Sequence, residues 1–265
     1  MGRNAVLEPL LRSVWNDVDG VAVHARVSTR EFPAHQTPVI FVHGLGASVR
    51  YMEPTMQLLA RTHPVAGLDL PGFGRSGTPK HALSLSELSQ ALARWLAARE
   101  LPPGILVGNS FGCQVIVDCV SRDASCAVAL MLNAPTMDPA HRTAFGQLIR
   151  VIADIPREPM SLAVIVARDY LRAGPIRLLK TLRAALADRI EEKLPSIALP
   201  TVVICGARDP VVTVAWAGEV ARLTGRDLPT APGATLKVLD HAAHALPYDA
   251  PDAFVAAILE LAQRL

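Results

Sequence analysis

The sequence predicts an α/β fold, with a mostly parallel eight-stranded sheet, helices on both faces and an inserted helical cap. Apolar runs typical of buried strands alternate with helical segments, as a sheet built from βαβ units requires. The alternation stops between residues 136 and 197, where no strand is indicated. The chain has 265 residues, 51% of them apolar, which is enough for one large domain with an insertion.

Composition narrows the partners that we expect. The formal net charge is only +2 and no long Lys/Arg block is present, so we expect no nucleic-acid partner and a small-molecule substrate instead. No apolar stretch reaches the roughly 20 residues that cross a bilayer, so we expect no membrane partner. Oligomeric state is left open.

The N-terminus and the cysteines point to the cytoplasm. Glu8 and Pro9 interrupt any apolar signal core, and Val6 stands where a myristoylation signal needs Ser or Thr. The cysteines form no C-x-x-C pair and have no His-rich companion, so we expect buried, reduced thiols and no metal site. They are Cys113, Cys119, Cys126 and Cys205.

The first elements are a hairpin and two βα units. Strands over 13–18 and 21–27 flank Asp19-Gly20, a hairpin turn signal that predicts an antiparallel start. A loop over 33–38 precedes a buried strand over 39–42, and a helix over 51–61 leads to a strand over 65–68. Asp69 begins a Pro-Gly turn cluster, where we expect it to accept backbone hydrogen bonds in a structural role.

Glycines follow the buried strand over 39–42. In His43-Gly44-Leu45-Gly46 they let backbone N–H groups approach a ligand closely, and the N–H of Leu45 is our candidate donor to an anion. An ordinary strand-to-helix loop is the alternative. Further on, Ser84 and Glu87 form a capping box that opens a helix to about Arg99, with Trp95 on its apolar face.

A second glycine-rich turn follows the strand over 105–107 and opens a helix that includes 113–120. A chain can double back this sharply only if the residues two before and two after the apex are small, and Gly108 and Gly112 occupy those places. Ser110 at the apex is then exposed as a nucleophile, and the N–H of Phe111 is a second anion donor. A turn that serves only packing is the alternative.

A strand over 127–132 precedes the insertion, residues 136–197, which divides a core made of 1–135 and 198–265. Its proline spacing predicts helices over 140–155, 160–172 and 176–194, and such a cap would exclude water from a pocket. Its many arginines include candidates for pairing with an anionic substrate, although solvated helix faces explain most of them. They are Arg142, Arg150, Arg157, Arg168, Arg172, Arg177, Arg183 and Arg189.

The last third restores the α/β pattern. A strand over 200–205 ends before Asp209, at the sheet edge where open α/β sheets bind ligands. A helix containing Trp216 follows, and a strand over 235–239 leads to His241 and His244. Helix 251–265 closes the chain, with Phe254 and its i+4 and i+7 neighbours facing the sheet.

Ser110, Asp209 and His244 each follow a predicted strand. A serine hydroxyl needs a base within about 3 Å, and that base needs a carboxylate to hold its tautomer. The chain order of nucleophile, acid and histidine is the order found in α/β-hydrolases.

The sequence resembles the α/β-hydrolase family over nearly its whole length. The matching motifs are His43-Gly44-Leu45-Gly46, the segment Asp69 to Ser76, Gly108-Asn109-Ser110-Phe111-Gly112, the segment Gly206 to Asp209, and His244 with Asp249, Pro251 and Phe254. The resemblance implies a serine hydrolase with Ser110, Asp209 and His244 as triad, and with the N–H groups of Leu45 and Phe111 as oxyanion hole. It implies acyl transfer with no metal or organic cofactor.

Some positions depart from the family's pattern. Ala243 stands where the family usually has Gly, and Asp249 where it has Glu. His241 is a competing base, but His244 alone keeps the family's spacing to the final helix.

The first functional hypothesis is hydrolysis of a carboxylic ester or lactone of small to medium size. A carbon–carbon bond hydrolase of dienone acids is the runner-up, although Ala245 stands where that subfamily often carries Trp. Haloperoxidase-type activity shares the same triad, and a non-catalytic small-molecule receptor of the same fold stays open. A serine nucleophile argues against dehalogenases and epoxide hydrolases of this fold, which use Asp.

Overall fold

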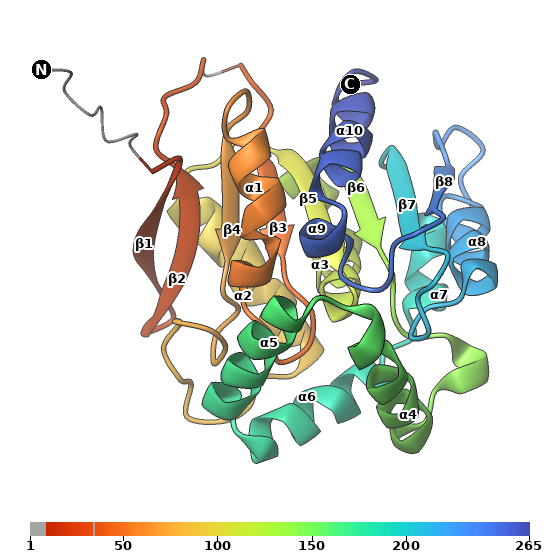
Figure 1. The fold of residues 1–265 in the computed structure, drawn as a ribbon. Coiled ribbons are helices and arrows are strands. Elements are labelled where there is room, and N and C mark those ends of the chain that lie inside the picture. The colour runs from red at the N-terminus through yellow and green to blue at the C-terminus, as the bar shows by residue number, and fades with distance from the viewer. Residues whose placement is uncertain (1–8, 34) are drawn as a thin grey trace, which may run out of the picture.

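One eight-stranded sheet runs through the molecule in the computed structural model, which describes residues 9–33 and 35–265 (Figure 1). The spatial order is β1-β2-β4-β3-β5-β6-β7-β8, with β1–β2 and β2–β4 antiparallel and all other pairings parallel. The bounds are β1 Leu11–Val18, β2 Val21–Ser28, β3 Val39–Val42, β4 Val65–Leu68, β5 Gly104–Asn109, β6 Ala127–Asn133, β7 Thr201–Gly206 and β8 Ala234–Leu239. The predicted sheet and its antiparallel start are confirmed.

The hairpin between β1 and β2 turns where the sequence predicts. Asp19 and Gly20 both have positive φ, at 55° and 78°, as a tight two-residue hairpin turn requires. The side chain of Asp17 accepts the N–H of Gly20. The predictions about a signal core and a myristoylation signal rest on residues 1–9, of which only Pro9 is described.

Helices cover both faces of the sheet (Figure 1). One face packs on α1 (Glu53–Leu59), α9 (Leu246–Asp249) and α10 (Pro251–Ala262), and the other on α2 (Leu85–Ala98), α3 (Phe111–Arg122) and α8 (Val214–Leu223). Strand β3 shows how the two cores arise. Val39 and Phe41 belong to the first core and Ile40 and Val42 to the second, because successive side chains of a strand point to opposite faces.

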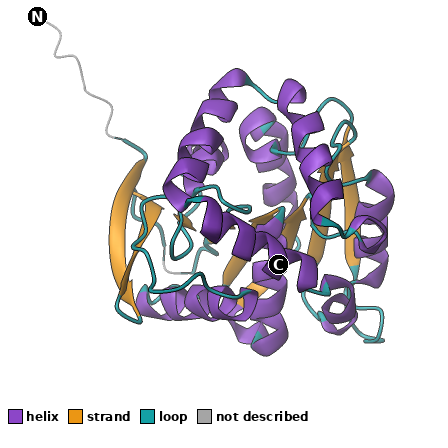
Figure 2. Ribbon diagram, turned by 90° about the horizontal axis from the view of Figure 1, so that it is seen from below, coloured by secondary structure: helices purple, strands orange, loops and turns teal. Residues whose placement is uncertain are grey.

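The chain forms four helices between β6 and β7, and the first three of them lie below the strands in the view of Figure 1. They are α4 (Ala144–Asp154), α5 (Met160–Ala173), α6 (Pro175–Ala187) and α7 (Ile190–Lys193). Figure 2, which looks from that end, shows helices arched in front of the strands. The segment from 134 to 200, all of it described, contains no strand. The division into a core and a cap at residues 136 and 197 stays a prediction.

Two predicted helices of the insertion are shorter than the sequence suggests. The continuous helix over 176–194 is wrong, because Asp188 leaves the helical conformation at φ −71° and ψ 139°. Its carboxylate accepts hydrogen bonds from Gln114 and Lys193, a tertiary contact that outweighs local helix propensity. The helix over 140–155 begins only at Ala144, since the side chain of Thr143 caps it by accepting the N–H of Gly146.

The structure also tests the smaller predictions about the helix cap, the tryptophans and the cysteines. The capping box of α2 forms, and Trp95 and Trp216 are buried. All four cysteines are free thiols, although Cys126 is only half-buried. No helix in the described part of the chain combines the length and apolar character that crossing a membrane requires.

Candidate active site

Ser110 is the single residue between β5 and α3, and its backbone conformation is strained. Its φ of 57° and ψ of −121° lie in a region that residues other than glycine rarely adopt. A Cβ on Gly108 would lie 2.7 Å from the nitrogen of Cys113, and one on Gly112 would lie 2.3 Å from the carbonyl oxygen of Val42. The turn therefore closes only with glycine at both places.

Asp209 and His244 come together from loops that follow β7 and β8. His244 Nδ1 lies 2.8 Å from Asp209 Oδ2. The other oxygen, Oδ1, accepts the N–H groups of Val211 at 2.7 Å and Val212 at 3.0 Å, so the carboxylate is held on both sides. The Asp209 side chain is fully buried and that of His244 is 16% exposed. The Asp209 carboxylate thus fixes the ring and its Nδ1–H tautomer.

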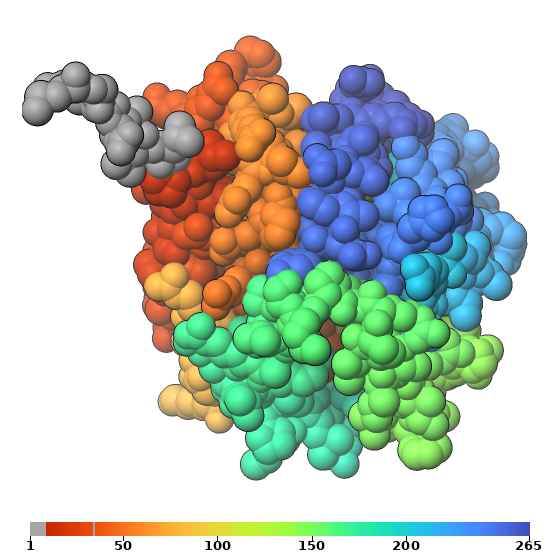
Figure 3. Space-filling model, in the orientation of Figure 1, coloured from red at the N-terminus to blue at the C-terminus, as the bar shows by residue number. Residues whose placement is uncertain are grey.

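A cavity of about 410 Å³ joins these groups. Ser110, His244, Leu45 and Phe111 all line it, and most of the remaining lining is apolar and comes from the insertion. Figure 3 shows a hollow between the green spheres of the insertion, in the lower part of the view. His241 is exposed and does not line the cavity. Among the described residues, no hydrogen bond joins Ser110 to His244, and apo sites commonly tighten only with substrate.

The two proposed donors have free N–H groups. Neither the N–H of Leu45 nor that of Phe111 has an acceptor within the described ranges. Gly46 adopts a positive φ of 75°, and a Cβ there would lie 2.5 Å from Leu178 and 2.7 Å from Tyr170 of the insertion. This glycine therefore lets the loop pass directly beneath the inserted helices.

A hydrogen-bonded chain fixes the loop that carries Leu45. The N–H of Gly44 donates to the hydroxyl of Tyr51 at 3.0 Å, and that hydroxyl donates to Asn109 Oδ1 at 2.5 Å. Asn109 Nδ2 lies 3.4 Å from the carbonyl oxygen of His244. Sequence reasoning missed Tyr51, because one tyrosine in a predicted helix carries no signal of this contact.

His43 is buried and neutral beneath this loop. Its Nε2 accepts the N–H of Leu70 at 2.9 Å, and its Nδ1–H donates to the carbonyl oxygen of Gly44 at 2.8 Å. Burial lowers its pKa, against the pull of the Asp69 and Asp169 carboxylates and of that hydrogen bond. His43 is therefore a support for the loop.

Two carboxyl groups of the insertion also line the cavity. Asp154 ends α4 and Glu158 follows one turn later; burial raises their pKa values to about 6 and about 7. Burial disfavours protonation of His244, but Asp209 together with Asp154 and Glu158 raises its pKa to about 9. Neither insertion residue stands in a sequence pattern that marks a functional carboxylate.

A second Ser, His and Asp set lies outside the cavity. Asp69 accepts the N–H groups of Val49 and Arg75 at 2.8 Å each, which confirms its structural role. It also lies 2.8 Å from His24 Nδ1, whose Nε2 lies 3.0 Å from Ser13 Oγ. This Ser13 lies within strand β1, with no turn that frees its hydroxyl and presents backbone donors beside it. The set ties the hairpin to the turn after β4.

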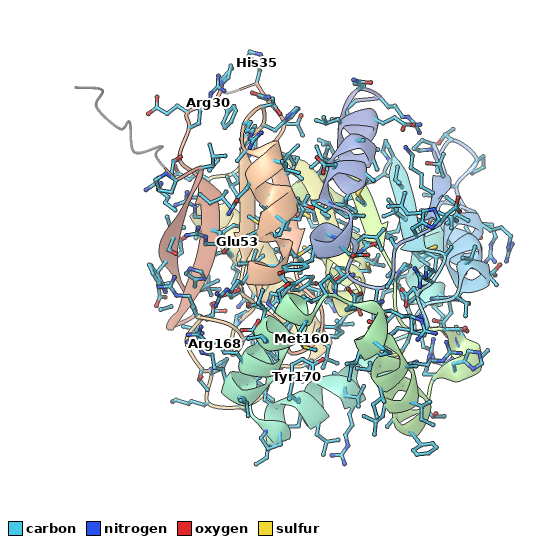
Figure 4. All side chains as sticks on the ribbon, in the orientation of Figure 1. Arg30, His35, Glu53, Met160, Arg168 and Tyr170 are labelled. Atoms are coloured by element: carbon cyan, nitrogen blue, oxygen red, sulfur yellow. The ribbon has the colours of Figure 1, made fainter. Side chains whose placement is uncertain are left out.

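The cavity contains no basic side chain from the part of the chain that the structure describes, apart from His244. None of the eight arginines of the insertion lines it; Arg168 on α5, labelled in Figure 4, is exposed. No arginine of the insertion is therefore placed to pair with an anionic substrate in this cavity, although the sequence offered them as candidates. No group of three or more potential metal ligands occurs within the described ranges.

Comparisons with known proteins agree with this architecture. The sequence model of the alpha/beta hydrolase family matches residues 39–257. A poly(3-hydroxyalkanoate) depolymerase of Ectopseudomonas oleovorans is 26% identical over 207 residues, 71% of this chain and 73% of that protein. An abhydrolase domain-containing protein of Caenorhabditis elegans is 35% identical over 79 residues, 28% of this chain and only 18% of its own length.

A solved structure shows a similar fold. The enol-lactonase from Burkholderia xenovorans has a TM-score of 0.77 at 20% identity, with 94% of this chain and all of that chain covered. At this identity the likeness concerns the fold alone.

Proposed function

The chain belongs to the alpha/beta hydrolase family, and from that premise we propose that it hydrolyses a carboxylic ester or lactone of a small to medium molecule through an acyl-enzyme. One observation carries the proposal: a strained Ser110 and His244, whose ring is hydrogen-bonded to the buried Asp209, line one largely apolar cavity. Volumes of this order are typical of small-molecule sites. Relatives named as a poly(3-hydroxyalkanoate) depolymerase and an enol-lactonase fit this reaction class.

The proposed mechanism gives each of these groups one role. His244 Nε2 takes the proton of Ser110 Oγ as that oxygen attacks the carbonyl carbon. The free N–H groups of Leu45 and Phe111 stabilise the oxyanion, and Asp209 balances the charge of the imidazolium. His244 gives the proton to the leaving oxygen, then activates a water that releases the acyl group.

The alternatives have less support. A dienone acid carries a carboxylate, and no arginine or lysine lines the cavity in the described part of the chain to receive it. A non-catalytic receptor does not explain why Ser110 adopts a strained conformation beside two free N–H groups.

The test is hydrolysis of short-chain p-nitrophenyl esters and simple lactones by wild type and Ser110→Ala. We expect the variant to lose 10³-fold or more, as removal of a triad member does, on the order of 4 kcal/mol of transition-state stabilisation. Circular dichroism checks that the variant folds. Wild-type rates in the variant, or no hydrolysis of either class by wild type, would refute the proposal.

A further inference from the structure

Two carboxyl groups in the cavity have no part in the proposed acyl transfer. Asp154 and Glu158 both belong to the insertion and line the same cavity as Ser110 and His244. Asp154 is only 9% exposed, and its Oδ1 is buried without a hydrogen-bond partner within the described ranges. Burying an unpaired carboxylate oxygen is costly, so the arrangement calls for a partner that the chain itself does not supply.

Glu158 is held rigidly and presents a second such oxygen. Its Oε1 accepts the N–H groups of His244 at 2.9 Å and Ala245 at 2.8 Å. Its Oε2 is buried and has no partner among the residues that the structure describes. Because the first oxygen is anchored by two donors, the second cannot swing away to solvent without breaking both bonds.

No basic residue in the described part of the chain forms a hydrogen bond with the two unpartnered oxygens, although the charge of His244 lowers the pKa of both carboxyl groups and that of Arg157 lowers the pKa of Asp154. His244 is the only basic residue of the described chain in the cavity lining, and it is bonded to Asp209. Arg157 is exposed and donates to the carbonyl oxygen of Ala153. Arg150 donates to the carbonyl oxygen of Pro210. The cavity is therefore acidic as well as apolar.

We propose that Asp154 and Glu158 form a cation-binding subsite that takes the ammonium group of the substrate, an ester or lactone that also carries a protonated amine. The inference rests on the proposed function. An ammonium offers three N–H donors, so it can satisfy both unpartnered oxygens and also balance their charge. A hydroxyl offers one donor and leaves the charge in place.

The subsite also acts on the catalytic base. Burial disfavours the charged imidazolium, yet the carboxylates of Asp209, Asp154 and Glu158 together raise the pKa of His244 to about 9. A bound ammonium offsets the charge of the two insertion carboxylates. The His244 pKa then falls, and more of the imidazole is the neutral base when such a substrate is present.

A binding measurement tests the subsite without turnover. Ser110→Ala protein is titrated by calorimetry at pH 8 with n-hexylammonium chloride and with n-hexanol, which have the same number of heavy atoms. We expect at least tenfold tighter binding of the ammonium, and loss of that preference when Asp154→Asn is added. Glu192→Gln removes an exposed carboxylate of the insertion and is the matched control, with the preference retained.

Kinetics supply the second arm, with p-nitrophenyl 6-aminohexanoate and its isostere p-nitrophenyl heptanoate. In wild type we expect a tenfold higher kcat/KM for the amino ester, and in Asp154→Asn or Glu158→Gln a preference for heptanoate. Equal binding of the two calorimetric probes, no binding of hexylammonium, or a preference that survives Asp154→Asn overturns the subsite. If wild type hydrolyses neither ester, the proposed function fails, while the calorimetry still decides on the subsite.

Discussion

The strongest prediction concerns the charge on His244, because the protonation of this ring determines how the rate depends on pH. Burial opposes the charged ring, but Asp209 in the loop after β7, together with Asp154 at the end of α4 and Glu158 just after it, raises the His244 pKa from 6.5 to about 9. A raised pKa means that the ring is protonated through neutral pH. The base form appears only as pH rises through about 9.

The size of the effect follows from that value. With a pKa of about 9, roughly 1% of the free enzyme holds neutral His244 at pH 7 and about half does at pH 9, a rise of about fiftyfold. An imidazole at its ordinary value is already mostly neutral at pH 7 and would gain less than about twofold. The two cases are easily told apart.

The assay is kcat/KM for a neutral p-nitrophenyl ester from pH 6 to 10, corrected for spontaneous hydrolysis, because this ratio reports the free enzyme's pKa values. We expect a tenfold rise per pH unit between 7 and 8 and a plateau above 9. In Glu158→Gln, which removes one carboxylate near the ring, the midpoint moves to lower pH and activity at pH 7 rises relative to the plateau. A flat profile from pH 7 to 9 would refute the reasoning.

Three further predictions concern the support of the site and the fold. Tyr51→Phe removes the hydroxyl that donates to Asn109, and we expect kcat to fall about tenfold with little change in KM or melting temperature. Gly112→Ala places a Cβ 2.3 Å from a backbone oxygen, and we expect a loss of about 3 kcal/mol or more in urea unfolding, or no soluble protein. Burial opposes the charge of Asp118, but hydrogen bonds from Arg122, Lys193 and Ser89 hold its pKa at about 2. Asp118→Asn should therefore destabilise the fold by about 1–3 kcal/mol at pH 7, with the difference shrinking as pH falls through 2.

The fold was largely predictable because local signals agreed with tertiary needs. The hairpin signal at Asp19-Gly20 matches the positive φ values found there. Strands β3 and β4 begin and end at the predicted residues, since their continuous apolar runs suit burial on both faces. The interruption at Asp188 was not predictable, because its cause is a contact with Gln114, 74 residues away.

The residues of the candidate site also divide into those that a local sequence pattern indicates and those that depend on distant contacts. Ser110 was identifiable because a strand, two glycines and a helix must surround such a turn, a pattern written in consecutive residues. Tyr51 and Glu158 carry no such pattern. Tyr51 acts through Asn109, 58 residues away, and Glu158 accepts backbone N–H groups 86 and 87 residues away. Contacts of this kind depend on how the insertion packs, which periodicity does not encode.

The insertion therefore contributes charge to the site as well as shape. An insertion that lined the cavity with apolar residues alone would exclude water, and Asp209 would then be the one carboxylate that stabilises the charged form of His244. Here Glu158 accepts a hydrogen bond from the backbone N–H of His244. A change in the position of the insertion would therefore alter both the access to the cavity and the pKa of His244. A neutral ester in the cavity would leave His244 protonated, whereas a bound ammonium would lower its pKa and favour the neutral base. Substrate choice and activation of Ser110 are then set by the same two carboxyl groups.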